Sequence, residues 1–347
     1  MTLDGILVTP TLECNIACGH CGQGRDIKQL TMDDEVLEKL LNEIASQKIP
    51  EVDISGGEVL SPKYRQRLLN ALQTTKLGEK TEVNIHTSGW WAHNEAYARK
   101  IVGQLKNVHV ASVSLSMGVY HQKFVPLENI ANIIQLCEEA SIGVHEIRVR
   151  SFKSTYHREV ELIKKLAEIS GRPIHKTMVW YQPTGSISRS TRFTTFNGFF
   201  DVYAHVGGFE GLKSVFQAVY SLGESSGYFP MGGGVSGINV THAQATWAGI
   251  ARETTNKGDI INPWLSGNPP IAYRPQIEKL TVMPDGSLLT DCGWAEMNDR
   301  WRARLGVYPR MSLAEAQRVS TSKLYGLGKF YLDVATFPLT FMPKKTA

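Results

Sequence analysis

Three cysteines, Cys14, Cys18 and Cys21, lie close together in a segment that directly follows the first predicted strand. Three thiolates can hold three irons of a [4Fe–4S] cluster and leave the fourth iron open to a reactant, whereas an electron-transfer cluster normally takes four cysteines. Three close cysteines also suit a structural zinc ion, with His20 or a distant residue as the fourth ligand. The spacing therefore predicts a metal site and favours the open cluster over zinc.

A second candidate motif, Ser55-Gly56-Gly57-Glu58, follows the second predicted strand. Its glycines would let the backbone approach a ligand closely, and its carboxylate could bind an ammonium group. Taken alone, a Gly-Gly pair after a strand is more often only a turn. Its place one βα unit after the cysteines supports a ligand site at this end of the predicted sheet.

The pattern Cys-x3-Cys-x2-Cys after an N-terminal strand, followed by Gly-Gly-Glu, resembles the signature of the radical S-adenosylmethionine (SAM) superfamily. The resemblance implies one [4Fe–4S] cluster on Cys14, Cys18 and Cys21, with SAM chelating the open iron through its amino and carboxylate groups. It also implies that an electron from a flavodoxin- or ferredoxin-type donor cleaves SAM to methionine and a 5′-deoxyadenosyl radical. His20 would pack near the adenine. The residues implied to hold the SAM amino group are Ser55, Gly56, Gly57 and Glu58.

Five further residues are candidates for contacts with SAM. Thr87 begins a Thr-Ser-Gly turn that resembles the family's Thr-Asn-Gly turn after the third strand. Ser114 and Ser116 end the fourth strand, where relatives often place a polar or acidic residue at the ribose; Ser116 replaces the frequent Asp. Arg148 and Arg150 alternate on the fifth strand and so face one side. Either guanidinium could pair with the SAM carboxylate, and a salt bridge at the barrel rim explains them equally well.

From about residue 5 to residue 190, runs rich in valine and isoleucine alternate with amphipathic stretches, which predicts βα units around a parallel sheet. The predicted fold class is α/β, a partial (β/α)6 TIM-type barrel whose chemistry lies at the carboxyl ends of the strands. Thr31 is expected to cap the first helix, with Asp34 three residues later. The predicted strands are 5–9, 51–55, 82–87, 108–114, 144–150 and 175–181. The other predicted helices are 64–74, 95–105, 127–141 and 158–169.

Three segments are expected: the partial barrel at 1–189, an insertion or lid rich in glycine and aromatic residues at 190–276, and an extension at 277–347. The extension should hold a hairpin at 277–291, turning at Pro284-Asp285-Gly286, and a helix at 313–324. It resembles the SPASM or Twitch extensions of the superfamily. Their auxiliary clusters need at least three thiolates, and only Cys137 and Cys292 remain, so we expect a degenerate extension without a second cluster.

The two remaining cysteines are expected to differ in role. Cys137 lies among apolar positions of a predicted helix and is expected to be a core residue. Cys292 follows the predicted hairpin, which would fold against the mouth of the barrel. Its thiol could donate a hydrogen atom to a substrate radical and so invert a carbon centre, as in some epimerases that it resembles. A packed thiol or a relic of a lost cluster site explains Cys292 at least as well.

Composition excludes several classes of function. The chain has 347 residues, of which 37 are basic and 33 acidic, with no block of like charge, so nothing demands a nucleic-acid or anionic-membrane partner. Its apolar stretches fall short of the roughly 18 residues that a membrane span needs. An odd count of five cysteines, three of them clustered, argues against a disulfide framework and favours a reducing, cytoplasmic compartment.

The favoured function is hydrogen abstraction from a small molecule, such as a natural product, a sugar or an amino-acid derivative, with epimerisation at Cys292 as one outcome. This expectation rests on the first strand, which begins almost at once and leaves no room for an N-terminal peptide-recognition module. Modification of a ribosomally made peptide is the enzymatic alternative, and a non-catalytic zinc-binding protein is the other. The modest charge disfavours an RNA-modifying enzyme.

Overall fold

The computed structural model describes residues 3, 5–21, 30–151, 153–172, 174–179, 238–244, 279–289 and 304–319. Its strands form one ten-stranded sheet in the order β10-β9-β8-β1-β2-β3-β4-β5-β7-β6. Every neighbouring pair from β8 to β6 is parallel, and the β8-β9 and β9-β10 pairs are antiparallel. Within the described residues the sheet is open, as expected of a partial barrel.

Helices and strands alternate through the first half of the chain, which confirms the predicted βα order. The strands are β1 (Gly5–Thr11), β2 (Glu51–Gly56), β3 (Glu82–Thr87), β4 (Ser112–Met117), β5 (Gly143–Ser151), β6 (Ile174–Val179), β7 (Ile238–Gln244), β8 (Lys279–Val282), β9 (Ser287–Leu289) and β10 (Arg304–Val307). The α-helices are α1 (Asp34–Ser46), α2 (Arg65–Thr75), α3 (Glu95–Asn107), α4 (Leu127–Glu139) and α5 (Tyr156–Ser170).

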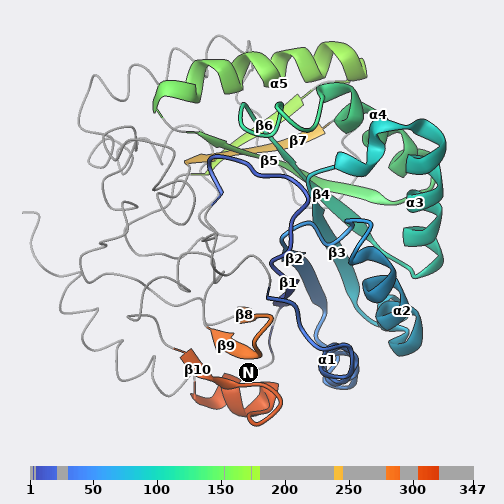
Figure 1. The fold of residues 1–347 in the computed structure, drawn as a ribbon, viewed down its shortest axis with the longest axis vertical. Coiled ribbons are helices and arrows are strands. Elements are labelled where there is room, and N and C mark those ends of the chain that lie inside the picture. Colours follow the sequence, from blue (N-terminus) through green and yellow to red (C-terminus); the bar gives the residue numbers. More distant parts are fainter. Residues whose placement is uncertain are drawn as a thin grey trace, which may run out of the picture.

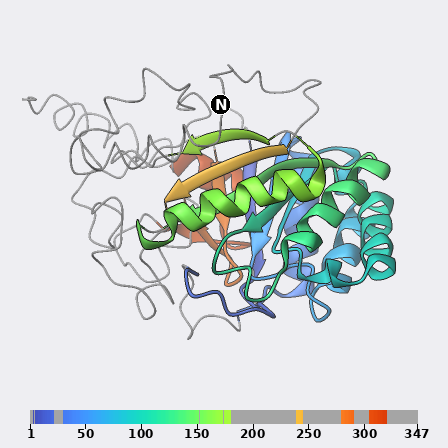
Figure 2. The same cartoon turned by 90° about the horizontal axis from the view of Figure 1, so that it is seen from above.

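The hydrophobic core lies between the helices and one face of the sheet. The helices lie along the outer side of the curved strands, as Figure 1 and Figure 2 show from two directions. In α1 the buried residues Leu37, Leu40, Leu41 and Ile44 recur at helical spacing, and they share one core with Val52 and Ile54 of β2. Alternate strand residues therefore point to the opposite, inner face. Among the described residues, no helix is long and apolar enough to cross a membrane.

Two local predictions are wrong. Asp33, not Thr31, caps α1, because its carboxylate accepts a hydrogen bond from the Glu35 amide at 2.9 Å. β4 begins at Ser112 rather than at Val108, because α3 runs on to Asn107 and the next residues complete its last turn. The first turn of α1 is preceded by Asp33 rather than by Thr31, and the residues directly after α3 close that helix instead of starting the strand.

One strand lies within the segment that was expected to be an insertion or lid. β7 pairs in parallel with β5 on one side and β6 on the other, so β6 is not the direct neighbour of β5. The rest of 190–276 lies outside the described residues, and the three predicted segments remain predictions.

The C-terminal hairpin is present where it was predicted. β8 and β9 are joined through Pro284-Asp285-Gly286, and β8 pairs in parallel with β1, so this hairpin extends the sheet beyond its first strand. Residues 313–319 are helical, and the Leu313 amide donates to Glu43 of α1 at 2.8 Å. The remainder of the predicted last helix lies outside the described residues.

The segment that leads into the cysteines is fixed from two sides. Backbone hydrogen bonds join Leu12 to Leu30 and Met32 to Pro10, and the Thr11 and Thr31 hydroxyl groups lie 2.7 Å apart. On the other side, the Gly57 amide donates to the Thr11 carbonyl at 2.8 Å and the Glu58 amide to the Glu13 carbonyl at 2.9 Å.

The close approach of these two backbone segments explains why residues 56 and 57 are both glycine. Gly56 has a φ of +143°, and a Cβ at Gly57 would lie 1.9 Å from the Glu13 carbonyl oxygen. A side chain at Gly57 would therefore push apart two backbone segments.

Gly57→Ala should disturb this contact, since only a backbone shift can make room for the methyl group. We expect the free energy of unfolding to fall by about 1–3 kcal/mol, measured by chemical denaturation. Gly103→Ala is the matched control, because nothing lies within 4 Å of its added Cβ on the exposed side of α3. This control should gain about 1 kcal/mol. Equal stability of Gly57→Ala and the wild type would contradict the close-contact explanation.

Candidate active site

The three cysteines lie on the loop after β1, at the carboxyl edge of the parallel strands. Cys18 is buried, Cys14 and Cys21 are half-buried, and the Cys21 amide donates to the Cys18 carbonyl at 3.2 Å in a turn. The chemistry of the donor set fits an iron–sulfur cluster, because three thiols are presented by one loop whose base is fixed to the sheet.

Glu58 links the loops that follow β2 and β3. Its buried carboxylate accepts hydrogen bonds from the Thr87 hydroxyl at 2.7 Å, from the Ser88 amide at 2.7 Å and hydroxyl, and from the Leu60 amide at 3.0 Å. Burial raises the pKa of Glu58, and these donors oppose the rise. The structure thus brings together two residues that were predicted to contact SAM, Glu58 and Thr87, and joins them to each other.

The inner face of the sheet carries a polar network that the sequence analysis missed. Its centre is His86 on β3, whose Nε2 lies 3.1 Å from an Asp53 oxygen and whose Nδ1 lies 2.7 Å from the Arg148 guanidinium. Since a guanidinium only donates, Nδ1 accepts the hydrogen bond from Arg148, and Nε2 lies 3.1 Å from both the Asp53 oxygen and the Asn84 amide nitrogen. Burial lowers the pKa of His86, as does the Arg148 charge, while Asp53 acts the other way.

Asn84 and Glu146 complete this network. The Asn84 amide donates to Asp53 at 2.7 Å and to the hydroxyl of Ser114 at 3.1 Å, and Arg148 also forms an ion pair with Glu146. The network therefore spans β2, β3, β4 and β5, and two predicted SAM-contacting residues, Ser114 and Arg148, are part of it. Alternating polar residues on adjacent buried strands were the signal that could have revealed it.

Other residues that were predicted to contact SAM lie near the carboxyl ends of their strands. Ser55 and Ser116 are half-buried near the carboxyl ends of β2 and β4, and Ser116 is in register with Arg148 of β5. Arg150 lies one pleat further along β5, and its charge helps to lower the pKa of His20, for which burial is the larger cause. Both arginines thus lie on one side of β5, as expected. Cys292 lies outside the described residues.

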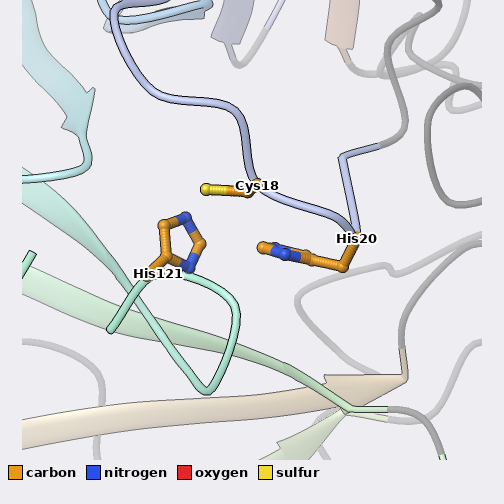
Figure 3. A group of neighbouring side chains, drawn as sticks. All are labelled: Cys18, His20 and His121. Carbon is orange, nitrogen blue, oxygen red and sulfur yellow. The ribbon is translucent and has the colours of Figure 1, made fainter. Parts of the chain in front are cut away.

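A compact group of side chains surrounds Cys18. His20 and His121 approach edge to face with ring centroids 4.7 Å apart, and Tyr120 packs 5.2 Å from His20. Figure 3 shows Cys18, His20 and His121 turned toward one another, with His121 coming from the loop after β4. His121 was not singled out in the sequence, because nothing local distinguishes it from other loop histidines.

A buried glutamate supports the loop that carries His121. Glu159 of α5 is fully buried, and its carboxylate oxygens lie 2.9 and 3.0 Å from the Val119 amide, which donates to them. Burial raises its pKa to about 8, opposed by the Val119 amide and by Arg158. Glu159 therefore ties α5 to the loop after β4.

A family model described as "Radical SAM superfamily" matches residues 8–183. The chain belongs to the radical SAM superfamily. Radical SAM enzymes use a [4Fe–4S] cluster and SAM, so the chain is an enzyme with these cofactors, as the cysteine spacing had indicated.

The chain is similar to known proteins in sequence and in fold. The chain is 27% identical over 125 residues to the "Putative peptide biosynthesis protein YydG" of Bacillus subtilis, a match that covers 35% of this chain and 38% of that protein. Its fold is similar to the crystal structure of Streptococcus suis SuiB bound to precursor peptide SuiA, with a TM-score of 0.50 and 15% identity. This match covers 87% of the chain and 62% of SuiB. The chain thus spans less than two thirds of either protein.

The expected preference for a small-molecule partner is wrong. YydG is named for peptide biosynthesis, and SuiB is bound to a precursor peptide. The expectation had rested on a short segment before β1, whereas the side chains of the pocket decide the class of substrate.

Glu159→Gln should flatten the pH dependence of stability. With a native pKa of about 8 against an ordinary value of 4.5, the native state binds the proton more tightly than the unfolded state. The free energy of unfolding that protonated Glu159 contributes is therefore complete below about pH 4.5 and is lost as the pH rises to about 8. Glutamine can still accept from Val119 but cannot ionise, so between pH 5 and 8 the variant should lose less unfolding free energy, by on the order of a few kcal/mol.

Urea denaturation at three pH values measures this difference. Glu161→Gln is the matched control, because Glu161 lies on the exposed side of the same helix. Parallel pH profiles for Glu159→Gln and the wild type would exclude a buried, protonated Glu159.

Proposed function

We propose that this radical SAM enzyme modifies a peptide, at a cluster held by Cys14, Cys18 and Cys21. The observation that carries the assignment is the cysteine loop, whose base is hydrogen-bonded to the Gly-Gly-Glu segment at the carboxyl edge of the parallel sheet. The similarity to YydG supports a peptide as the substrate class.

When bound, the cluster supplies the electron that cleaves SAM and so generates the radical that abstracts hydrogen. The chain's own residues hold SAM across the inner face of the sheet. Gly56 and Gly57 would offer backbone groups to the SAM amino group, and Ser114 and Ser116 would contact the ribose. His20 would pack near the adenine.

Glu58 and Arg148 act mainly as positioning residues in this proposal. The Glu58 oxygens already accept from Thr87, Ser88 and Leu60, so this carboxylate fixes the loops around the SAM amino group. Arg148 is engaged with Glu146 and His86. Arg150, whose charge acts on His20 beside the cysteine loop, is the better placed arginine for the SAM carboxylate.

Substitution of any ligand cysteine should abolish cluster binding. Reconstituted without oxygen, the wild type should hold about four irons and form 5′-deoxyadenosine from SAM under dithionite. Cys14→Ser, Cys18→Ser and Cys21→Ser should lose both, because two thiolates do not retain the cluster. Cys137→Ser is the matched control. The Cys137 thiol is buried in α4, and burial raises its pKa to about 12, so it is not expected to be a ligand. The Cys137→Ser variant should therefore keep the full iron content of the wild type. A colourless wild-type protein would overturn the cluster assignment.

Cys292 is proposed as the hydrogen-atom donor of a peptide epimerisation. After abstraction of an α-hydrogen by the SAM-derived radical, the Cys292 thiol gives its hydrogen to the opposite face of the carbon radical, and the resulting thiyl radical is reduced to the thiol by one electron from the flavodoxin- or ferredoxin-type donor and one proton from water. Co-expression with short precursor peptides encoded near the gene, followed by reaction in D2O and mass spectrometry, tests this step. The wild type should add one deuterium per inverted residue.

Cys292→Ala should still bind iron and form 5′-deoxyadenosine but give no inverted residue. Unchanged stereochemistry and rate in this variant would exclude the donor role. Formation of 5′-deoxyadenosine with no change in any tested peptide would count against the peptide proposal.

A further inference from the structure

Two imidazole nitrogens beside Cys18 are buried without a hydrogen-bond partner. They are the Nδ1 atoms of His20 and His121, and neither finds an acceptor or donor among the described residues. One ligand atom from each histidine and the Cys18 sulfur all lie within 4.8 Å of one another (Figure 3). Buried polar atoms are rarely left unpaired, so this arrangement calls for a ligand.

The chemistry of His121 indicates which kind of ligand fits. Its Nδ1 is buried and makes no hydrogen bond among the described residues. A neutral imidazole protonated on one nitrogen presents a lone pair on the other. The Nδ1 lone pair and the Cys18 sulfur are both electron-pair donors, and what brings such donors together is a cation.

The site is built from two supported segments. His121 lies on the loop that Glu159 holds through the Val119 amide, and its own amide donates to the Gly118 carbonyl at 2.9 Å. His20 is held against Tyr120. In a tetrahedral zinc site, sulfur and nitrogen ligands lie about 3.4–3.6 Å apart, so an adjustment of roughly 1 Å from the present positions would close the site.

We propose that the protein without its cluster binds one divalent transition-metal ion of the zinc type through Cys18, His20 and His121. The ion and the [4Fe–4S] cluster exclude one another, because both require the Cys18 thiolate. Only this exclusion rests on the proposed function; the metal site itself rests on the three side chains. The fourth position of the ion is left to water or another small ligand.

Titration of the cluster-free protein with Co²⁺, in the absence of oxygen, tests the site. The absorption of bound Co²⁺ should show one thiolate ligand rather than three. Cys18→Ser and His121→Phe should weaken Co²⁺ binding by more than tenfold, whereas Cys14→Ser and Cys21→Ser should change it by less than about threefold. His20→Phe gives the same test at a half-buried position, in case His121→Phe does not fold.

Iron reconstitution separates this site from the cluster. His121→Phe should still take up about four irons, while Cys21→Ser should bind Co²⁺ but no cluster. Zn²⁺ added before iron and sulfide should block reconstitution of the wild type and not of His121→Phe. If Cys14→Ser and Cys21→Ser weaken Co²⁺ binding as much as His121→Phe does, the three cysteines alone hold the ion and the proposal fails.

Discussion

The contact between two backbone segments, one before Cys14 and one after β2, is the constraint on which the candidate site depends. β1 and β2 are parallel neighbours, and their register shifts between Val8 and Thr11 so that Thr11 lies opposite Gly56. Beyond that shift the chain leaves the sheet, and the amides of Gly57 and Glu58 take over as hydrogen-bond donors to it. Because backbone meets backbone here, the position of the cysteine loop is set by the geometry of the sheet and not by flexible side chains.

The two faces of the sheet differ in the residues that they present. The helix-covered face holds buried residues such as Ile54 and Ile85, and the hydrophobic core lies there. A closed TIM barrel fills its interior with layers of branched apolar side chains. The interior-facing positions of this open sheet instead carry Asp53, His86 and Arg148, joined by hydrogen bonds. The apolar core is thereby confined to the helix-covered face, and the inner face presents polar groups.

Much of the fold was predictable because its signals are local. The alternating apolar residues of β2 and β3, the spacing of apolar residues in α1 and the Pro-Asp-Gly turn each identify an element within a few residues. The insertion of β7 between β5 and β6 was not predictable, since the pairing of strands distant in sequence leaves no mark on either strand alone. The error at Thr31 has a different cause: two polar side chains, two residues apart, can cap the same helix terminus, and the Asp33 carboxylate is the stronger acceptor.

The residues of the candidate site also fall into two groups, those that the sequence identifies and those that only the fold brings together. The cysteines and the Gly-Gly-Glu segment are contiguous motifs, so their types and spacing identify them. His86 and His121 acquire their roles from neighbours on other strands and loops, such as Asp53 in β2 or Cys18 after β1.

The position of Cys18 joins these two kinds of residue. It belongs to the motif that the sequence reveals, and it also faces histidines that only the fold brings near it (Figure 3). His20 lies on the cysteine loop itself, whereas the loop of His121 is held by Glu159 of α5 through the Val119 amide. The distance between these two histidines is therefore set by how the cysteine loop sits on the sheet. Cys18 lies on the cysteine loop and faces His121, so its thiol can belong either to the three cysteines or to the group of Cys18, His20 and His121. The backbone contact at Gly57, which anchors the loop, is common to both sets of ligands.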